Sequence, residues 1–298
     1  MPKLRKLKPF INEKIWGGEK LKALKNISST LPVGETWEVS SLSSGKSILL
    51  DSGEPIDQDL SYIVKFIDTS DNLSVQVHPD DEYAKEHENE TGKTECWIIL
   101  SAEENAGIYL GFKKGVTRKE FINAATNKMA CNQFLNFIPV KAGDFFVLPP
   151  GTVHAIGKGI TLCEVQQKSD ITYRVWDWNR SPAGANGKIR ELHLDKASDV
   201  LQFGEAFNQK ILSSIKNNIF EFEGIQTLIK HRDFKVELFN KFKNSQLELK
   251  VNHGDSIILF DGAIDDLVSW DSALVEGNGS LLLENHQVST FLLVSGKN

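Results

Sequence analysis

Short β-rich runs separated by turn residues most constrain what this chain can fold into. Segments such as GETWEVSSLSSG, YIVKFIDTS and TECWIIL are rich in β-branched and aromatic residues, with Gly, Pro, Asp, Asn and Ser between them. Further runs of this kind are LSVQVH, AGIYLGF, FFVLPPGTVHAIG and ITLCEVQQ. This pattern is typical of an antiparallel sandwich or barrel. We therefore predict a mostly-β fold with a few short helices.

Helix signals are sparse. The clearest covers residues 117–132, where Thr117 and Glu120 form a T-x-x-E capping box ahead of an apolar stripe. A second short helix is predicted after Pro79, because three acidic residues follow that proline and would occupy the first turn. A third is predicted around residues 196–203, where it would join two halves of the chain.

Composition excludes several classes of partner. The chain has 298 residues, of which 40% are hydrophobic, and this is enough for one large or two medium domains. The net charge is −6 and the basic residues are scattered, so we expect no nucleic-acid or anionic-membrane partner. No apolar run reaches the length of a signal peptide core or a membrane span, which predicts a cytoplasmic protein. The three cysteines lie far apart and are predicted to be buried free thiols.

The sequence contains one internal repeat. KAGDFFVLPPG at residues 141–151 aligns with NHGDSIILFDG at residues 252–262, with Gly-Asp, a hydrophobic strand and a second glycine at the same spacing. Three residues after that glycine the first copy has His154 and the second has Asp265. We interpret the pair as a degenerate repeat of one β-unit, of which only the first copy kept a functional histidine.

The stretch SVQVHPDD suggests a metal site. Gln76 and His78 are two residues apart in a predicted strand, so their side chains project from the same face. Antiparallel pairing with the next predicted strand can bring Glu95 beside them, and the turn in LPPGTVH supplies His154. Two imidazoles, a carboxylate and a carbonyl oxygen form a mixed set that suits Zn²⁺ or another divalent ion.

Several motifs then resemble a known family. The spacing Gly143-x5-Pro149-x-Gly151-x2-His154 matches the second signature motif of the cupin barrel. Together with PFINEKIWGG, GETWEVS, VKFIDTSDNLSVQVHPDD, GKTECW and DITYRVWDWNR, it makes residues 9–193 similar to the type I phosphomannose isomerases, or mannose-6-phosphate isomerases, of the short bacterial form. The last hundred residues carry no comparable motif.

This resemblance implies a double cupin built from two jelly-roll-like β-barrels. Residues 1–200 would form the catalytic zinc domain with a short helical insertion, and residues 201–298 a degenerate cupin-like domain. The family's zinc ligands correspond to Gln76, His78, Glu95 and His154, with one zinc ion per chain. Its catalytic residues correspond to Arg174, Glu164, Asp170 and Lys93, and its substrate-binding residues to Trp16, Lys65 and Ser74. The large helical domain of longer relatives is absent, so phosphate contacts from that domain have no counterpart here.

The implied reaction interconverts mannose 6-phosphate and fructose 6-phosphate through an enediolate. Zinc can polarise the two sugar oxygens, and Arg174 or Lys93 can add positive charge beside the developing oxyanion. The proton carrier needs a pKa near the working pH, which burial gives a carboxylate. Glu164 is the first candidate, Asp170 the second and a water on the metal the third.

Other functions fit parts of the same pattern. Two histidines and a carboxylate also form the facial triad of non-haem iron oxygenases, although Gln76 would then fill a position that O₂ needs. Cupins also serve as non-catalytic sugar-binding metal proteins, and related isomerases act on other phosphosugars. Taken alone, Arg174 could stack on Trp176 or pair with Asp177, and Lys65 could be a structural side chain.

Overall fold

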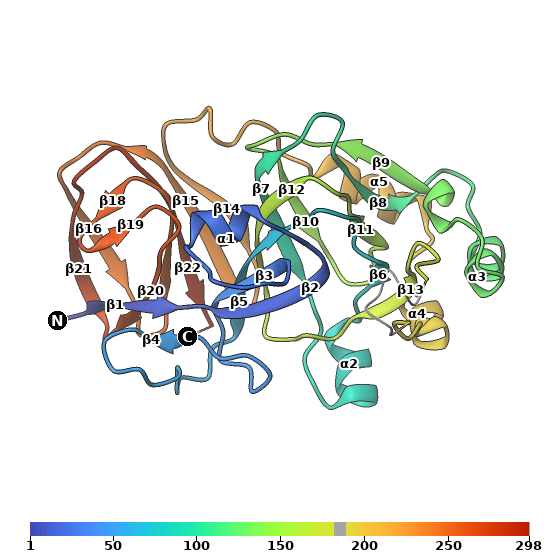
Figure 1. The fold of residues 1–298 in the computed structure, drawn as a ribbon, viewed down its shortest axis with the longest axis horizontal. Coiled ribbons are helices and arrows are strands. Elements are labelled where there is room, and N and C mark those ends of the chain that lie inside the picture. Colours follow the sequence, from blue (N-terminus) through green and yellow to red (C-terminus); the bar gives the residue numbers. More distant parts are fainter. Residues whose placement is uncertain (182–188, 298) are drawn as a thin grey trace.

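The computed structural model describes residues 1–181 and 189–297 and consists of two β-units side by side (Figure 1). The first unit contains two facing sheets. The six-stranded sheet has the order β10 (Phe145–Leu148), β7 (Glu95–Ala102), β12 (Ile160–Gln167), β5 (Tyr62–Asp68), β3 (Val33–Val39) and β2 (Phe10–Gly18). The five-stranded sheet has the order β13 (Tyr173–Trp176), β6 (Val75–Val77), β11 (His154–Ile156), β8 (Gly107–Phe112) and β9 (Leu135–Pro139).

The second unit is dominated by one large sheet. Its order is β14 (Gly224–Lys230), β15 (Phe234–Phe242), β22 (Ser289–Gly296), β17 (Ser256–Asp261), β20 (Ser272–Glu276), β1 (Lys3–Lys8) and β4 (Ile48–Leu49). Two small sheets complete the unit: β16 (Gln246–Val251) with β21 (Gly279–Glu284), and β18 (Ala263–Ile264) with β19 (Leu267–Val268). β1 runs antiparallel to β20, so the start of the chain belongs to the sheet formed mainly by the last third (Figure 1). The division at residue 200 stays a prediction.

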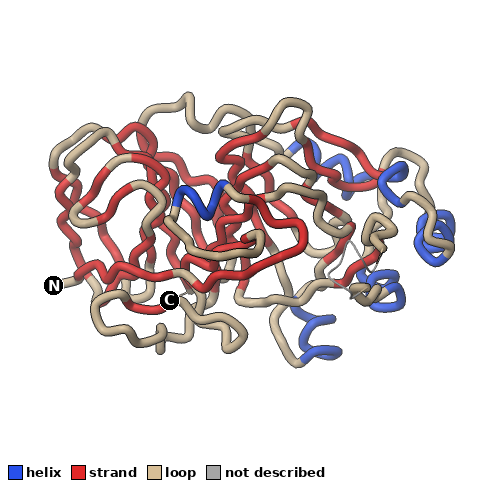
Figure 2. The backbone as a smooth tube through the Cα atoms, viewed as in Figure 1, coloured by secondary structure: helices blue, strands red, loops and turns tan. Residues whose placement is uncertain are grey.

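Helices are short, as Figure 2 shows. They are α1 (Lys20–Leu24), α2 (Asp81–Glu88), α3 (Arg118–Thr126), α4 (Leu194–Val200) and α5 (Glu205–Ser213), with a 3₁₀ turn at Cys131–Phe134. The capping box of α3 forms as predicted, but this helix ends at Thr126 because Lys128 adopts a positive φ of 55°. The predicted mostly-β fold with a few short helices is confirmed. In the part of the chain that the structure describes, no helix has the length and apolarity needed to cross a membrane.

The central strands of the six-stranded sheet are buried on both faces. On one face, Val64, Phe66 and Cys163 belong to an apolar core that also contains Val236 and Leu292 of the second unit. On the other face, Glu164 lies opposite Lys65 of β5 and opposite Trp97 of β7. Because successive strand residues alternate between faces, one set of strands joins the two units and supplies polar groups to the interior of the first.

The internal repeat has a structural counterpart. In both copies the glycine before the strand has a positive φ, 87° for Gly143 and 90° for Gly254. In both copies the following aspartate, Asp144 or Asp255, accepts a hydrogen bond of 2.9 Å from the backbone amide three residues earlier. Asp265, which aligns with His154, instead receives a 2.7 Å hydrogen bond from the amide of Glu284 in a surface turn. The second unit therefore kept the turn and the strand but uses the last position for local structure.

A buried tyrosine links the two units away from the polar face. The hydroxyl oxygen of Tyr62 lies 2.9 Å from the carbonyl oxygen of Gly254 and 2.8 Å from the hydroxyl oxygen of Ser256. We expect Tyr62→Phe to lower the free energy of unfolding by about 1–2 kcal/mol, because it leaves a buried carbonyl without this donor. Urea denaturation of both proteins measures the difference. An unchanged midpoint would contradict this role.

Candidate active site

The proposed metal ligands come from both sheets of the first unit. Gln76 is in β6 and pairs directly with His154 of β11 on one side and with Arg174 of β13 on the other. His78 follows β6 and has the same side-chain direction as Gln76. Glu95 is the first residue of β7 in the opposite sheet. The two facing sheets therefore bring these side chains together across the interior of the unit.

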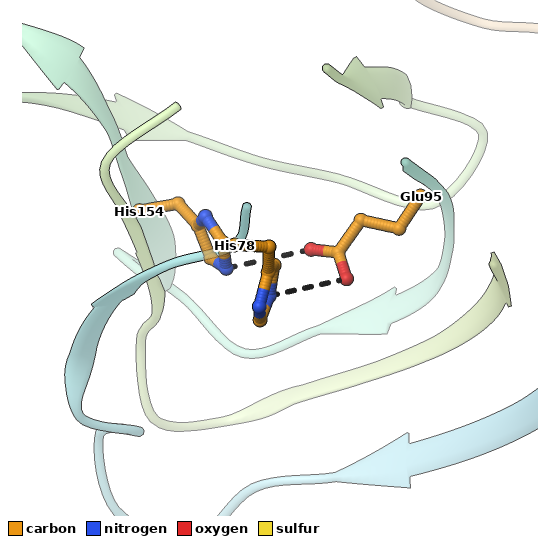
Figure 3. A group of neighbouring side chains, drawn as sticks. All are labelled: His78, Glu95 and His154. Carbon is orange, nitrogen blue, oxygen red and sulfur yellow. Dashed lines mark ion pairs between the residues drawn. The ribbon is translucent and has the colours of Figure 1, made fainter. Parts of the chain in front are cut away.

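His78, Glu95 and His154 form a compact triad (Figure 3). The Nε2 atom of His78 lies 3.5 Å from Oε2 of Glu95, and Nε2 of His154 lies 3.4 Å from Oε1. One donor atom from each residue lies within 4.8 Å of the others, and all three residues are buried. Within residues 1–181 and 189–297 this is the one group of His, Cys, Asp or Glu residues arranged to hold a metal ion.

Backbone carbonyls orient both imidazoles. The Nδ1 atom of His78 lies 2.7 Å from the carbonyl oxygen of Ile171, and Nδ1 of His154 lies 2.9 Å from that of Thr152. These contacts place the ring proton on Nδ1 and leave the Nε2 lone pair facing Glu95. Burial lowers the pKa of His154 to about 4, and burial with the charge of Lys93 lowers the pKa of His78 well below its ordinary value. Both rings are therefore neutral at pH 7, as metal ligands must be.

Glu95 supplies the charge that fits a cation. Among the described residues, neither of its buried carboxylate oxygens accepts a well-aligned hydrogen bond. The Nζ atom of Lys93 lies 2.8 Å from Oε2 of Glu95 and 3.3 Å from Nε2 of His78. Burial opposes the charged form of Lys93, but attraction to Glu95 and Glu164 outweighs it and raises the pKa of Lys93. A buried carboxylate whose Oε1 has no hydrogen-bond partner in the described part of the chain and whose Oε2 is paired with Lys93, facing two neutral imidazoles, is a donor set that suits a divalent metal.

Gln76 is adjacent to the triad, but its amide nitrogen faces it. Nε2 of Gln76 lies 3.2 Å from Nε2 of His154, while Oε1 accepts a 3.3 Å hydrogen bond from the hydroxyl of Ser74. A glutamine binds metal through its oxygen. Gln76 would therefore become a fourth ligand only after its amide turns over.

Glu164 lies in the centre of the polar face. The indole nitrogen of Trp97 donates a 2.8 Å hydrogen bond to Oε2, while Oε1 lies 3.7 Å from Nζ of Lys65 and 4.0 Å from Nζ of Lys93. Burial and the nearby charge of Glu95 raise the pKa of Glu164, against the opposing effect of the two lysines. A buried carboxyl with a raised pKa takes up a proton more readily than an exposed carboxyl, which suits a group that carries a proton.

Lys65 lies between Glu164 and the more exposed Asp170. Its Nζ atom lies 3.6 Å from Oδ1 of Asp170 and 4.7 Å from the centre of the Trp37 ring. The Asp170 side chain is 53% exposed, whereas that of Glu164 is 5% exposed. Of the two acids considered for proton transfer, Glu164 is therefore the one in a water-poor environment.

Arg174 is held at the edge of the five-stranded sheet. Its Nε atom donates a 3.3 Å hydrogen bond to the hydroxyl of Ser74, and one terminal nitrogen donates a 2.8 Å bond to the carbonyl of Glu191. Burial and the nearby charge of Arg190 lower the pKa of Arg174. Among the described residues, Arg174 neither stacks on Trp176 nor pairs with Asp177, which instead pairs with Arg180 and Arg190. The catalytic role of Arg174 stays a prediction.

One cavity of about 280 Å³ brings the remaining site residues together. Eight of the residues selected from the sequence line it: Trp16, Lys65, Ser74, Gln76, Lys93, Glu164, Asp170 and Arg174. Gln76 and Lys93 contact the triad directly, so they mark the end of the cavity that is nearest the triad.

Sequence reasoning missed three charged residues that line the same cavity: Lys14, Glu35 and Arg190. Glu35 accepts a 2.7 Å hydrogen bond from the indole of Trp37, and Lys65 and Lys14 outweigh its burial and lower its pKa. Lys14 and Glu35 lie inside the motifs FINEKIWGG and GETWEVS, so the signal was available. Arg190 lies after the last strand of the sheet, in a segment without strand or motif signals.

Comparison with known proteins shows the family to which the chain belongs. The chain is 40% identical over 223 residues to the mannose-6-phosphate isomerase of Streptococcus mutans, which covers 68% of this chain and 69% of that protein. The chain belongs to the mannose-6-phosphate isomerase family. Mannose-6-phosphate isomerase ManA of Bacillus subtilis is 39% identical over 217 residues, or 65% of this chain and 67% of that protein. No family model matched the sequence.

Solved structures extend the likeness over the full chain. The crystal structure of the mannose 6-phosphate isomerase from Bacillus subtilis superposes with a TM-score of 0.75 at 25% identity and covers 98% of this chain and 99% of that one. A phosphomannose isomerase from Salmonella typhimurium superposes with a TM-score of 0.74 at 13% identity, which shows the fold alone. The predicted family and its class, the aldose–ketose isomerases, are confirmed.

Proposed function

We propose that this chain is a cytoplasmic zinc enzyme that interconverts mannose 6-phosphate and fructose 6-phosphate through an enediolate. The observation that carries the proposal is a single cavity in which Glu164, Lys93 and Arg174 converge beside the His78–Glu95–His154 triad. The names of the relatives support the choice of substrate. A volume of about 280 Å³ is just below the usual range for small-molecule sites, so it suits a small polar ligand.

The charges along the cavity favour a phosphosugar. Five cationic residues line it, against three acids, and these cations are Lys14, Lys65, Lys93, Arg174 and Arg190. Arg174 and Arg190 are close enough for the charge of one to lower the pKa of the other, a repulsion that a bound anion relieves. We assign the sugar carbonyl to the end near Lys93, which contacts the triad, and the phosphate to cations of the lining that do not contact the triad, Lys14 and Arg190 among them.

Zinc is the ion that best matches the donor set. His78, Glu95 and His154 would hold it, and Gln76 could add its amide oxygen after turning over. When bound, zinc supplies Lewis-acid polarisation of the oxygens on C1 and C2. The carbonyls of Ile171 and Thr152 would keep both imidazoles in the ligating tautomer.

Glu164 is our candidate for the proton carrier. Its Oε2 is occupied by the indole of Trp97, so Oε1 takes the proton from C2 and returns it to C1. Lys93 and Arg174 provide positive charge near the oxygens that become negative in the enediolate. Asp170 is the second candidate, but its exposure keeps its surroundings closer to water.

Metal dependence is the first consequence. We expect one tightly bound zinc ion per chain, loss of isomerisation on chelation, and recovery when Zn²⁺ is added. His154→Ala should abolish tight binding, because only one imidazole and the weaker oxygen ligands remain. Metal analysis and a coupled assay with mannose 6-phosphate measure both effects.

The control for this experiment is His286→Ala, because His286 lies in the second unit, outside the triad and the cavity. This variant should keep one zinc ion and full activity. Full activity of thoroughly metal-free protein would contradict metal dependence, and a second tightly held ion would show a site that the triad does not explain.

Arg174 is expected to act in the transition state. Arg174→Ala should lower kcat/KM by the equivalent of about 3 kcal/mol, typical of a lost oxyanion donor, with zinc content unchanged. Arg118→Ala is the matched control, because Arg118 likewise donates to a serine hydroxyl and to a backbone carbonyl, but it lies on α3, outside the cavity. Loss of zinc or of folding in Arg174→Ala would instead indicate a packing role.

The route of the proton is also measurable. If Glu164 carries the proton, it can exchange with solvent, so isomerisation in D₂O should place deuterium on C1 of fructose 6-phosphate. Mass spectrometry of the product detects it, and Glu164→Gln should form neither labelled nor unlabelled product. Complete absence of deuterium over many turnovers would favour a direct hydride shift and exclude Glu164 as the base.

A further inference from the structure

The turn at residues 231–233 of the second unit contacts the end of β12 in the first unit. Residues 231–233 join β14 to β15 and carry Asp233, whose carboxylate is buried against the first unit. The side-chain nitrogen of Gln167, at the end of β12, donates a 2.7 Å hydrogen bond to Oδ2 of Asp233. Arg232 flanks the contact and places a terminal nitrogen 2.7 Å from the same oxygen.

Gln167 in turn holds the residue before Glu95. Its side-chain Oε1 accepts a 2.7 Å hydrogen bond from the backbone amide of Thr94. Its backbone amide donates a 3.0 Å hydrogen bond to the carbonyl oxygen of Thr94. Gln167 is 1% exposed, so water does not compete for these bonds. The side-chain amide of Gln167 therefore links Asp233 to Thr94, the residue that immediately precedes β7.

Asp81 ties the segments that carry His78 and Glu95 to the same cluster. Its Oδ1 accepts a 3.0 Å bond from the amide of Gly92 and a 3.1 Å bond from Gln167, while Oδ2 accepts a 2.9 Å bond from Arg232. Beside it, the amide of Lys93 donates a 3.0 Å bond to the carbonyl of Pro79. The backbone after His78 and the backbone before Glu95 are thus joined to each other.

We propose that Asp233 is a positioning residue for the active site, acting through Gln167 and Asp81 on the segments that carry His78, Lys93 and Glu95. The second unit then does more than bury one flank of the first, because it completes the support of the metal ligands. This inference rests on the proposed metal site. Metal ligands that are misplaced by about 1 Å bind the metal more weakly and lower activity. Residues that hold the ligands in place, such as Asp233, therefore have a measurable effect.

The test compares three variants of the full chain. Asp233→Ala removes the acceptor for both Gln167 and Arg232, whereas Asp233→Asn keeps an oxygen for Gln167 and loses only the ion pair. Tyr62→Phe is the matched control, because it deletes a buried hydrogen bond between the same two units outside the cavity. For each protein we would measure zinc affinity by chelator competition, kcat and KM, melting temperature, and amide exchange in residues 92–95.

We expect Asp233→Ala to weaken zinc binding by about 10-fold or more, the usual effect of losing outer support. Its kcat should fall with KM nearly unchanged, and exchange in residues 92–95 should accelerate. Asp233→Asn should lie between this variant and the wild type, and it carries the test if Asp233→Ala does not fold. Tyr62→Phe should lower the melting temperature without changing zinc affinity, kcat or exchange in residues 92–95.

The inference is overturned if Asp233→Ala and Asp233→Asn lose only thermal stability, as the control does, while zinc affinity and local exchange match the wild type. If the wild type binds no zinc, the metal proposal fails separately. Exchange in residues 92–95 then decides the positioning role by itself, because it depends on neither metal nor activity.

Discussion

The register of β12 between β5 and β7 is the constraint on which the rest of the structure depends. This register places Glu164 opposite Lys65 on one side and Trp97 on the other, inside the first unit. The neighbouring Cys163 and Val165 point the other way, into the apolar core shared with the second unit. A slip by one residue would exchange these faces, burying a carboxylate in the apolar interface and removing it from the cavity.

The polar interior costs stability that the apolar faces must offset. Lys65, Lys93, Glu95 and Glu164 are all buried, and each buried ion costs several kcal/mol unless it is paired. The contacts between them are long in places, such as the 4.0 Å between Lys93 and Glu164. Such incompletely satisfied charge is typical of functional sites rather than of structural cores. We infer that a metal ion and a substrate complete the balance of charge.

The two units share a turn-and-strand pattern but differ at the position of the histidine. The same glycine turn and aspartate hydrogen bond begin β10 and β17, yet Asp265 has taken the place that corresponds to His154. The second copy has no histidine at this position, but its strand β17 still contributes Ile258 and Phe260 to the core that contains residues of both units. The contacts of Tyr62 and Gln167, which lie opposite each other on β5 and β12, tie the second unit to the first.

The sequence by itself determined the mostly-β class, the capping box of α3, the repeat and the family. Those features depend on local propensity and on motifs that are contiguous in the chain. It also selected His78, Glu95 and His154, because Q-x-H and the P-P-G turn are short-range signals. The tertiary structure decided what depends on pairing between distant segments: that β1 joins the sheet of the second unit, and that Arg190 reaches the cavity. It also decided the contact of Asp233 with Gln167, because sequence patterns do not specify which strand edges and turns meet in space.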